Sequence, residues 1–326
     1  MAHPAGATAL LALTASLAFA PALSASAAAP PGTIALAPGS QPEGISNGPA
    51  GTVYAGSRAD GAIYRISLAD GSRTLLVPGF ANGAARGLQW DPRTGVLWVA
   101  GDVRGSGGRT TSTIIAYDAR TGERLRRISV PGRRFLNDVE VTANGVYVTD
   151  SRSAELVVVR DRGYALLPLT GEFSLTPGNN ANGIRELPDG DLVITQSSTG
   201  KLFKVDPATG VAAEIELTGT PLTSGDGLEL RGGVLYVVYG FGTDEVAVVR
   251  LRDGFTRGIV EGAVGAPTWT GRPPRCSPPA RCTPSTGASA SRPRPPRRTT
   301  SCGWTSRSSS ASCRRLWRFT WSFERA

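Results

Sequence analysis

Histidine is almost absent from this chain of 326 residues, and the single one, His3, lies in a segment that we expect to be removed. A mature protein without histidine has no Ser-His-Asp triad, no Cys-His pair and no His-ligated zinc. Cysteine is absent from residues 1–275. Any chemistry in this part of the chain must therefore rest on carboxylates, amides, hydroxyls and arginine.

Long apolar runs are scarce as well. The longest, residues 9–23, is interrupted by Pro21 and is shorter than the roughly 20 residues that a membrane-spanning helix needs. A small-x-small cleavage pattern at residues 25–27 follows it, so residues 1–29 are predicted to be the signal peptide of a secreted or extracytoplasmic protein without a stable membrane span. Because no Lys or Arg precedes the run, a disordered alanine-rich leader is the alternative.

Most of the chain lacks a net positive charge, although the formal net charge of the whole chain is +9. Residues 265–326 contain twelve Arg and a single acid, Glu324, which leaves the rest of the chain with a balance of −2. A nearly neutral body argues against nucleic acid as a partner.

One repeat unit occurs five times within residues 33–264, with openings spaced 43, 51, 45 and 44 residues apart. The openings are Glu43-Gly44-Ile45, Arg86-Gly87-Leu88, Asn137-Asp138-Val139, Asn182-Gly183-Ile184 and Asp226-Gly227-Leu228. After each opening come further runs rich in Val, Ile and Tyr, which Gly- and Asp-containing turns separate. Four short strands in about 45 residues are typical of one propeller blade, so the sequence predicts an all-β propeller with five readable blades.

The first residue of each opening has the same place in its repeat. In a propeller the first strand of each blade lines the central channel, so these side chains are expected to meet at its mouth. They are Glu43, Arg86, Asn137, Asn182 and Asp226. Carboxylate and amide oxygens suit calcium or magnesium rather than a soft metal. An anionic or oxygen-rich substrate could be held by Arg86. Arg133 and Arg134, which lie just before Asn137, could do the same.

An alternative is that Asn182-Gly183 and Asp226-Gly227 only form tight turns. Turn-forming residues would be interchangeable between blades, whereas the five side chains differ in charge at one fixed position of the repeat. This asymmetry favours a shared site. Asn180 and Asp189 lie outside that position and are interpreted as loop residues.

Four segments carry a further resemblance: residues 41–45 (QPEGI), 135–138 (FLND), 180–184 (NANGI) and 225–228 (GDGL). Together they resemble the gluconolactonase and senescence-marker-protein family of six-bladed propellers, especially its secreted actinobacterial-type members. The resemblance implies a divalent cation, with calcium the first choice, on Glu43, Asn182 and Asp226, and it implies that Asn137 faces the substrate. It also implies hydrolysis of a lactone or related ester, in which Asp226 helps to activate water.

A closed ring of that family has six blades, and the sixth would begin in residues 265–326, which contain no Val or Ile and only one Leu. This tail is interpreted as a cysteine-stapled module on Cys276, Cys282, Cys302 and Cys313, as a disordered Arg/Pro/Ser-rich extension, or as a sixth blade lost through a shift of the reading frame. Reading residues 299–310 one base earlier can return the alternating apolar residues of a strand, which favours the frameshift. Residues 33–36 are predicted to be an N-terminal strand that completes the last blade.

The leading hypothesis is a secreted, cation-dependent, lactonase-like hydrolase with a small-molecule substrate, or its frame-damaged and inactive remnant. The catalytic residues would be Asp226 and Asn137, and the substrate would bind to Asn137, Arg86 and Arg134. The alternative from another class is a non-catalytic propeller that binds ligands and holds a structural cation. A monomer is expected in either case.

Overall fold

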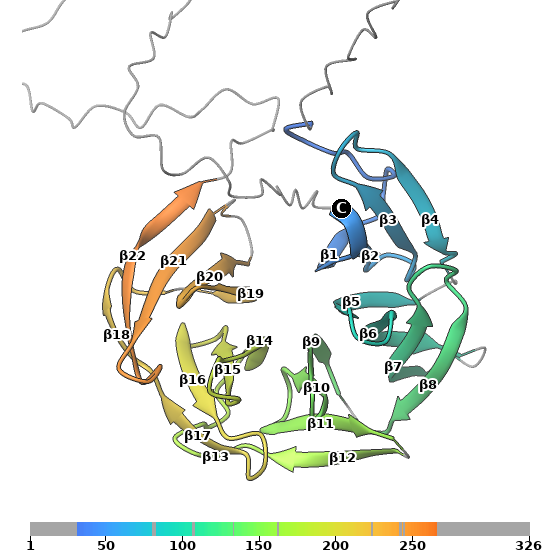
Figure 1. Ribbon diagram of the computed structural model, residues 1–326. Coiled ribbons are helices and arrows are strands. Elements are labelled where there is room, and N and C mark those ends of the chain that lie inside the picture. The colour runs from blue at the N-terminus through green and yellow to red at the C-terminus, as the bar shows by residue number, and fades with distance from the viewer. Residues whose placement is uncertain are drawn as a thin grey trace, which may run out of the picture.

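The computed structural model describes residues 31–265 apart from residues 80–82, 106–107, 133, 162, 223, 241–242 and 244. In this part the chain forms five sheets, arranged as consecutive blades around a central axis (Figure 1). Apart from a short 3-10 turn at Pro49–Gly51, the described elements are strands. The all-β propeller with five blades is confirmed. The predicted signal peptide and all of the tail beyond Gly265 lie outside the described residues.

Each blade has four antiparallel strands that follow one another in the chain. The first blade consists of β1 (Pro42–Asn47), β2 (Thr52–Ser57), β3 (Ile63–Ser67) and β4 (Arg73–Val77). The second consists of β5 (Ala84–Asp91), β6 (Val96–Arg104), β7 (Thr110–Asp118) and β8 (Arg124–Val130). The third consists of β9 (Leu136–Thr142), β10 (Gly145–Asp150), β11 (Glu155–Arg160) and β12 (Gly163–Pro168).

The last two described blades carry an extra strand each. The fourth blade consists of β14 (Ala181–Glu186), β15 (Leu192–Gln196), β16 (Lys201–Val205) and β17 (Val211–Glu214). The fifth consists of β19 (Gly225–Arg231), β20 (Val234–Tyr239), β21 (Glu245–Arg252) and β22 (Arg257–Gly265). The short strands β13 (Thr170–Gly171) and β18 (Glu216–Gly219) extend their outer edges by parallel pairing with β17 and β22. No helix in the described residues is long and apolar enough to cross a membrane.

The first strand of every blade lies nearest the axis, as the repeat predicted (Figure 1). Each of these inner strands, β1, β5, β9, β14 and β19, has a β-bulge or irregularity in its pairing with the second strand. In β14, for example, Ala181 pairs with Gln196 and Ile184 pairs with Ile194, so two residues of the inner strand lie opposite one. A bulge redirects the side chains that it displaces from the regular ladder. In all five blades the displaced residues include the first residue of the repeat opening.

Glycine follows that residue in four of the five inner strands, and in three of them it lets neighbouring blades approach closely. A Cβ atom on Gly183 would lie 2.2 Å from the backbone oxygen of Asp226 in the next blade, and Gly44 and Gly87 would have similar contacts of 1.8 and 2.3 Å. A side chain at these positions would push the inner strands apart. Gly227 in the fifth blade is different, because a Cβ atom there would meet no described atom closer than 3.9 Å.

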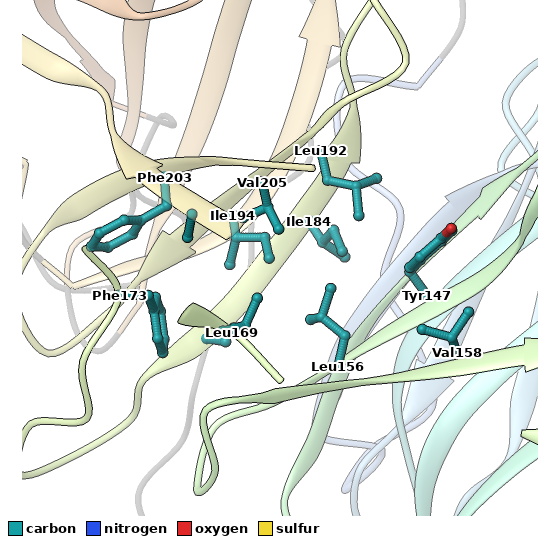
Figure 2. Close-up of a cluster of buried hydrophobic side chains, with 12 residues drawn as sticks. Tyr147, Leu156, Val158, Leu169, Phe173, Ile184, Leu192, Ile194, Phe203 and Val205 are labelled. Atoms are coloured by element: carbon teal, nitrogen blue, oxygen red, sulfur yellow. The ribbon is translucent and has the colours of Figure 1, made fainter. Parts of the chain in front are cut away.

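Apolar side chains between consecutive blades form the core, with one cluster at each of the four described interfaces. Figure 2 shows the cluster between the third and fourth blades, where Tyr147, Leu156 and Val158 face Ile194 and Phe203. Burying a side chain of this size contributes about 1.5–3 kcal/mol to folding. Packing between the faces of the sheets therefore sets the spacing of the inner strands and of the side chains that they carry to the axis.

The first blade is covered on the side that faces away from the second blade. Ile34 and Leu36 pack there against Val53, Ala55 and Ile66 of the first sheet. Residues 33–36 form no strand, so the prediction of an N-terminal strand is not met in the described structure. The segment instead shields an apolar sheet face from water.

The fifth blade carries apolar side chains on the side that faces away from the fourth blade. Alternation along β20 and β21 directs Tyr236, Val238, Val246 and Val248 to this face, and all four are only partly buried. Val264 on β22 pairs with Val246 and is 51% exposed. A contiguous apolar face of this kind is typical of a surface that has a packing partner. It is the face against which a sixth blade would pack.

Candidate functional site

The five candidate residues lie at the bulges of the five inner strands, and we call them together the axial site. They are Glu43 in β1, Arg86 in β5, Asn137 in β9, Asn182 in β14 and Asp226 in β19. Their charges act on one another across blades, because both Asp226 and Arg86 shift the pKa of Glu43. Such effects indicate side chains that lie near one another. The structure thus brings the first, second and fifth blades to one site.

The carboxyl groups of the axial site are less acidic than free carboxyl groups. The pKa of Glu43 is raised to about 7, chiefly by burial and then by the negative charge of Asp226, while Arg86 and Arg58 oppose the increase. Burial also raises the pKa of Asp226 to about 6, although the Asn182 side chain opposes that increase. At neutral pH both groups are therefore close to their titration range.

This set of oxygen donors fits a divalent cation. Glu43 and Asp226 offer carboxylates and Asn182 offers an amide oxygen, all of them hard ligands of the kind that calcium and magnesium prefer. The raised pKa values reflect burial and nearby negative charge, and a bound cation would stabilise the ionised carboxylates against both effects. Within residues 31–265 as described, no three His, Cys, Asp or Glu side chains are grouped as metal ligands, so a cation at this site would need the amide as well.

Two serines hold the amides of the axial site, and the repeat openings did not predict them. Asn137 donates a hydrogen bond from Nδ2 to Ser151 Oγ at 3.0 Å, and Asn182 donates one from Nδ2 to Ser197 Oγ at 2.9 Å. Both serines directly follow the second strand of their blade and end a Thr-x-Ser sequence, at residues 149–151 and 195–197. This shared pattern is the signal that could have identified them.

Arg86 is buried and already has partners. Its guanidinium forms an ion pair with Asp102, donates to the backbone oxygen of Leu136 at 3.2 Å and lies over the ring of Phe135 at 4.2 Å from the centroid. Asp102 thus anchors Arg86 in the second blade, as Ser151 anchors the amide of Asn137 in the third blade. Arg86 Nε is a buried donor without a partner among the described residues. Arg86 therefore brings positive charge to the axial site while one of its donors stays unused.

Arg134 lies in the loop that leads into β9 and is held by residues of its own blade. It forms ion pairs with Asp150 at 3.2 Å and with Glu155, and it donates to Ser153 Oγ at 2.9 Å. Its side chain is 14% exposed. These contacts order the loop, and a role for Arg134 in binding substrate stays a prediction. Arg133 lies outside the described residues.

An ion cluster that is buried except for Glu229 joins three blades next to the axial site. Asp138 takes the position that glycine occupies in the other inner strands, and its carboxylate lies 3.3 Å from Arg185 Nη1. Arg185 also lies 3.6 Å from Glu140 and 3.7 Å from Glu229. Burial raises the pKa of Asp138, and it raises that of Glu140 to about 7. Glu140, Arg185 and Glu229 share one position of the repeat, three residues after the first residue of each opening, and this shared position is the signal that could have identified the cluster.

A cavity of about 170 Å³ opens beside the axial site between the fourth and fifth blades. Asp226 and Asn182 form part of its wall, and the hydroxyls of Ser197, Ser198 and Ser224 line it as well. A small oxygen-rich molecule in this cavity would contact Asp226 directly.

Asn180 and Asp189, interpreted as loop residues, do lie outside the axial site. Asn180 is buried in the loop before β14, where its Oδ1 accepts a hydrogen bond from the backbone N–H of Thr176 at 2.8 Å. Asp189 lies in the hairpin between β14 and β15 and pairs with Lys204 at 2.7 Å. Asp189 is therefore a suitable control for substitutions of Asp226.

The raised carboxyl pKa values make stability depend on pH. A carboxyl group whose pKa is higher in the folded than in the unfolded state costs folding free energy as it ionises, so stability falls as the pH rises from the unfolded to the folded value. For Glu43 this window runs from 4.5 to about 7. In the cation-free protein we expect the Glu43→Gln variant to lose less unfolding free energy across this window than the unsubstituted protein, by on the order of 1–3 kcal/mol. Urea unfolding between pH 4.5 and 8 measures it, and parallel curves for the two proteins would contradict the assignment.

Comparison with known proteins supports the fold. A family model described as strictosidine synthase-like, N-terminal, matches residues 32–66, which include β1 and Glu43. No match is found among curated proteins. The chain is similar to a solved structure of a protein of unknown function from Bacteroides caccae, with 15% identity, 70% of this chain and 83% of that chain covered, and a TM-score of 0.52.

Two further solved structures are similar over most of the described residues. One is the β-propeller domain of Cps50 (Swd1) from Myceliophteria thermophila, with 15% identity, 69% of this chain and 72% of that chain covered, and a TM-score of 0.50. The chain has a β-propeller fold. The other is virginiamycin B lyase from Staphylococcus aureus, with 14% identity, 70% of this chain and 85% of that chain covered, and a TM-score of 0.48.

Proposed function

We propose that the protein is a divalent-cation-dependent hydrolase that opens the ring of a lactone or a related cyclic ester. The observation that carries the proposal is the pair of buried carboxyl groups, Glu43 and Asp226, on different blades beside two amides, in which the charge of Asp226 raises the pKa of Glu43. Groups with perturbed pKa values that converge in one place are typical of a functional site rather than of a turn. We also propose export from the cytoplasm, on the basis of the expected signal peptide in residues 1–29.

The cation would be held by Glu43, Asn182 and Asp226. Calcium is the first choice because all three offer hard oxygen donors. When bound, the cation would supply Lewis acidity that polarises the carbonyl group of the substrate. The remaining steps depend on side chains of this chain.

Asp226 is suited to act as the general base. In the cation-free protein burial raises the pKa of Asp226 to about 6, which makes this carboxylate a stronger base than a free aspartate. The water oxygen adds to the carbonyl carbon, the bond from that carbon to the ring oxygen breaks, and the proton returns from Asp226 to the leaving oxygen. Water and ester are consumed, and a hydroxy acid is formed.

Asn137 and Arg86 are proposed to position the substrate, on the third and second blades. Asn137 is anchored by Ser151, so its amide is held in one place before a substrate arrives. Arg86 adds a positive charge that favours an oxygen-rich or anionic ligand and lowers the pKa of Glu43. Arg134 would contribute through the loop that it orders.

Titration calorimetry with calcium and with magnesium, followed by a panel of lactones, tests the proposal. A hydrolase should bind one divalent cation and show turnover that a chelator abolishes. Binding of the cation without turnover of any lactone would favour the non-catalytic propeller with a structural cation. Absence of both would overturn the proposal.

We expect Asn137→Ala to reduce kcat/KM for lactone hydrolysis roughly 10²-fold, because a preorganised polar group at the reacting centre is lost. Cation affinity and melting temperature should change little, since Asn137 is not among the proposed cation ligands. Steady-state kinetics, calorimetry and a thermal melt on the same sample measure these effects. A large drop in melting temperature with normal kinetics would instead assign Asn137 a structural role.

A further inference from the structure

Ser151 and Ser197 occupy equivalent places in the third and fourth blades and make equivalent contacts. Each accepts a hydrogen bond from an axial-site amide, as described above. Each also donates its hydroxyl proton to a backbone oxygen of the next blade, Ser151 to Ala181 at 2.8 Å and Ser197 to Gly225 at 2.6 Å. These acceptors directly precede the next two residues of the axial site, Asn182 and Asp226.

Counting protons fixes the orientation of both amides. A serine hydroxyl has one proton, and a backbone carbonyl oxygen can only accept. Because each hydroxyl proton is committed to that carbonyl, the serine oxygen can only accept from the amide. Asn137 and Asn182 must therefore turn their NH₂ groups toward the serines and their Oδ1 atoms away from them.

The two Oδ1 atoms remain available for a ligand. No described residue donates a hydrogen bond to either of them, and neither is among the fully buried polar atoms that lack a partner. For Asn182, the side chain also lines the cavity beside Asp226.

We propose that Ser151 and Ser197 are positioning residues that hold the NH₂ groups of Asn137 and Asn182 and leave Oδ1 as the atom of each amide that can accept from or coordinate a ligand. The role of the Asn182 oxygen as a cation ligand rests on the proposed function, whereas its orientation does not. Because each hydroxyl bridges two blades, the orientation of each amide depends on the spacing of neighbouring blades. The axial site then offers oxygen acceptors from the first, third, fourth and fifth blades, a set that suits cations and hydrogen-bond donors beside the positive charge of Arg86.

Calcium titration of the full chain tests the effect on affinity. We expect Ser197→Ala to weaken calcium binding roughly 10- to 100-fold, the usual cost of losing a group that orients a ligand. Ser197→Thr keeps the hydroxyl and should restore most of the affinity. Ser198→Ala is the matched control, because Ser198 lines the same cavity but its hydroxyl contacts Thr176 instead.

A double-substitution cycle with Asn182 separates positioning from a general loss of structure. In the Asn182→Ala background, Ser197→Ala should cause no further loss of calcium affinity, because the amide that it orients is gone. Losses that add in full in the double variant would overturn the proposal. So would unchanged affinity in Ser197→Ala when the unsubstituted chain binds calcium.

Nuclear magnetic resonance of the cation-free chain tests the orientation even if no cation binds. The chain contains seven Asn residues, so asparagine-selective ¹⁵N labelling gives few side-chain signals. We expect the NH₂ protons of Asn137 and Asn182 to be protected from exchange with solvent and to lose that protection in Ser151→Ala and Ser197→Ala respectively. Unprotected NH₂ groups in the unsubstituted chain would overturn the proposal, whatever the outcome of the calcium titration.

Discussion

Replacing Asp226 with alanine should weaken binding of calcium by at least about 100-fold, because the loss of a direct carboxylate ligand exceeds the 10- to 100-fold cost of losing a group that only orients one. Asp189→Ala should leave calcium affinity unchanged, since Asp189 pairs with Lys204 in a hairpin away from the axial site. Both variants remove one aspartate and change the net charge equally, so a difference in calcium affinity between them reports the position of the aspartate. Calorimetry on the two variants measures it.

The same substitution has a second expected effect that needs no cation. The charge of Asp226 raises the pKa of Glu43, so Asp226→Ala should lower the pKa of Glu43 from its value of about 7. A pH titration of the Glu43 side-chain carbon signal reports it directly. Equal effects of Asp226→Ala and Asp189→Ala on calcium affinity and on this pKa would refute the axial site.

Restoring the reading frame after about residue 262 should convert the protein into a soluble, calcium-stabilised ring of six blades. The open apolar face of the fifth blade, with Val264 51% exposed, would then have a partner. A gain of several kcal/mol from packing that face corresponds to a rise in melting temperature of roughly 10 °C for a domain of this size. The chain with its present tail should be poorly soluble by comparison.

Two glycines provide a matched test of ring closure. In the present chain Gly183→Ala should be destabilising, because its Cβ atom would lie 2.2 Å from a backbone oxygen of the next blade, whereas Gly227→Ala should be nearly neutral. In the frame-restored chain Gly227→Ala should become as costly as Gly183→Ala. Thermal melts of the four variants measure this.

Sequencing the coding DNA of residues 262–271 tests the reading frame directly. A confirmed frame, together with a protease-resistant and disulfide-bonded tail, would show that residues 265–326 are a genuine cysteine-stapled module. Gly227→Ala would then remain neutral in every form of the protein. A confirmed frame with a tail that proteases digest readily would instead support the disordered Arg/Pro/Ser-rich extension.

Sequence alone determined the blades and the position in the repeat that the axial-site residues share. Alternating Val, Ile and Tyr residues and the turns between them are local signals, and a repeat with regular spacing carries each signal five times. Glu43, Asn182 and Asp226 could be grouped because equivalent positions of a propeller lie around one axis. The bulges that displace them from the ladder occur at that same position.

Only the tertiary structure decided how those side chains are held and how acidic they are. The pKa values of Glu43 and Asp226 are raised by burial and by charge from another blade, and neither effect is encoded in neighbouring residues. Ser197 bridges two blades through one oxygen atom, which depends on an interface formed by residues far apart in the chain. Local patterns fix which residue occupies each strand position, whereas desolvation and hydrogen-bond partners depend on how the blades pack.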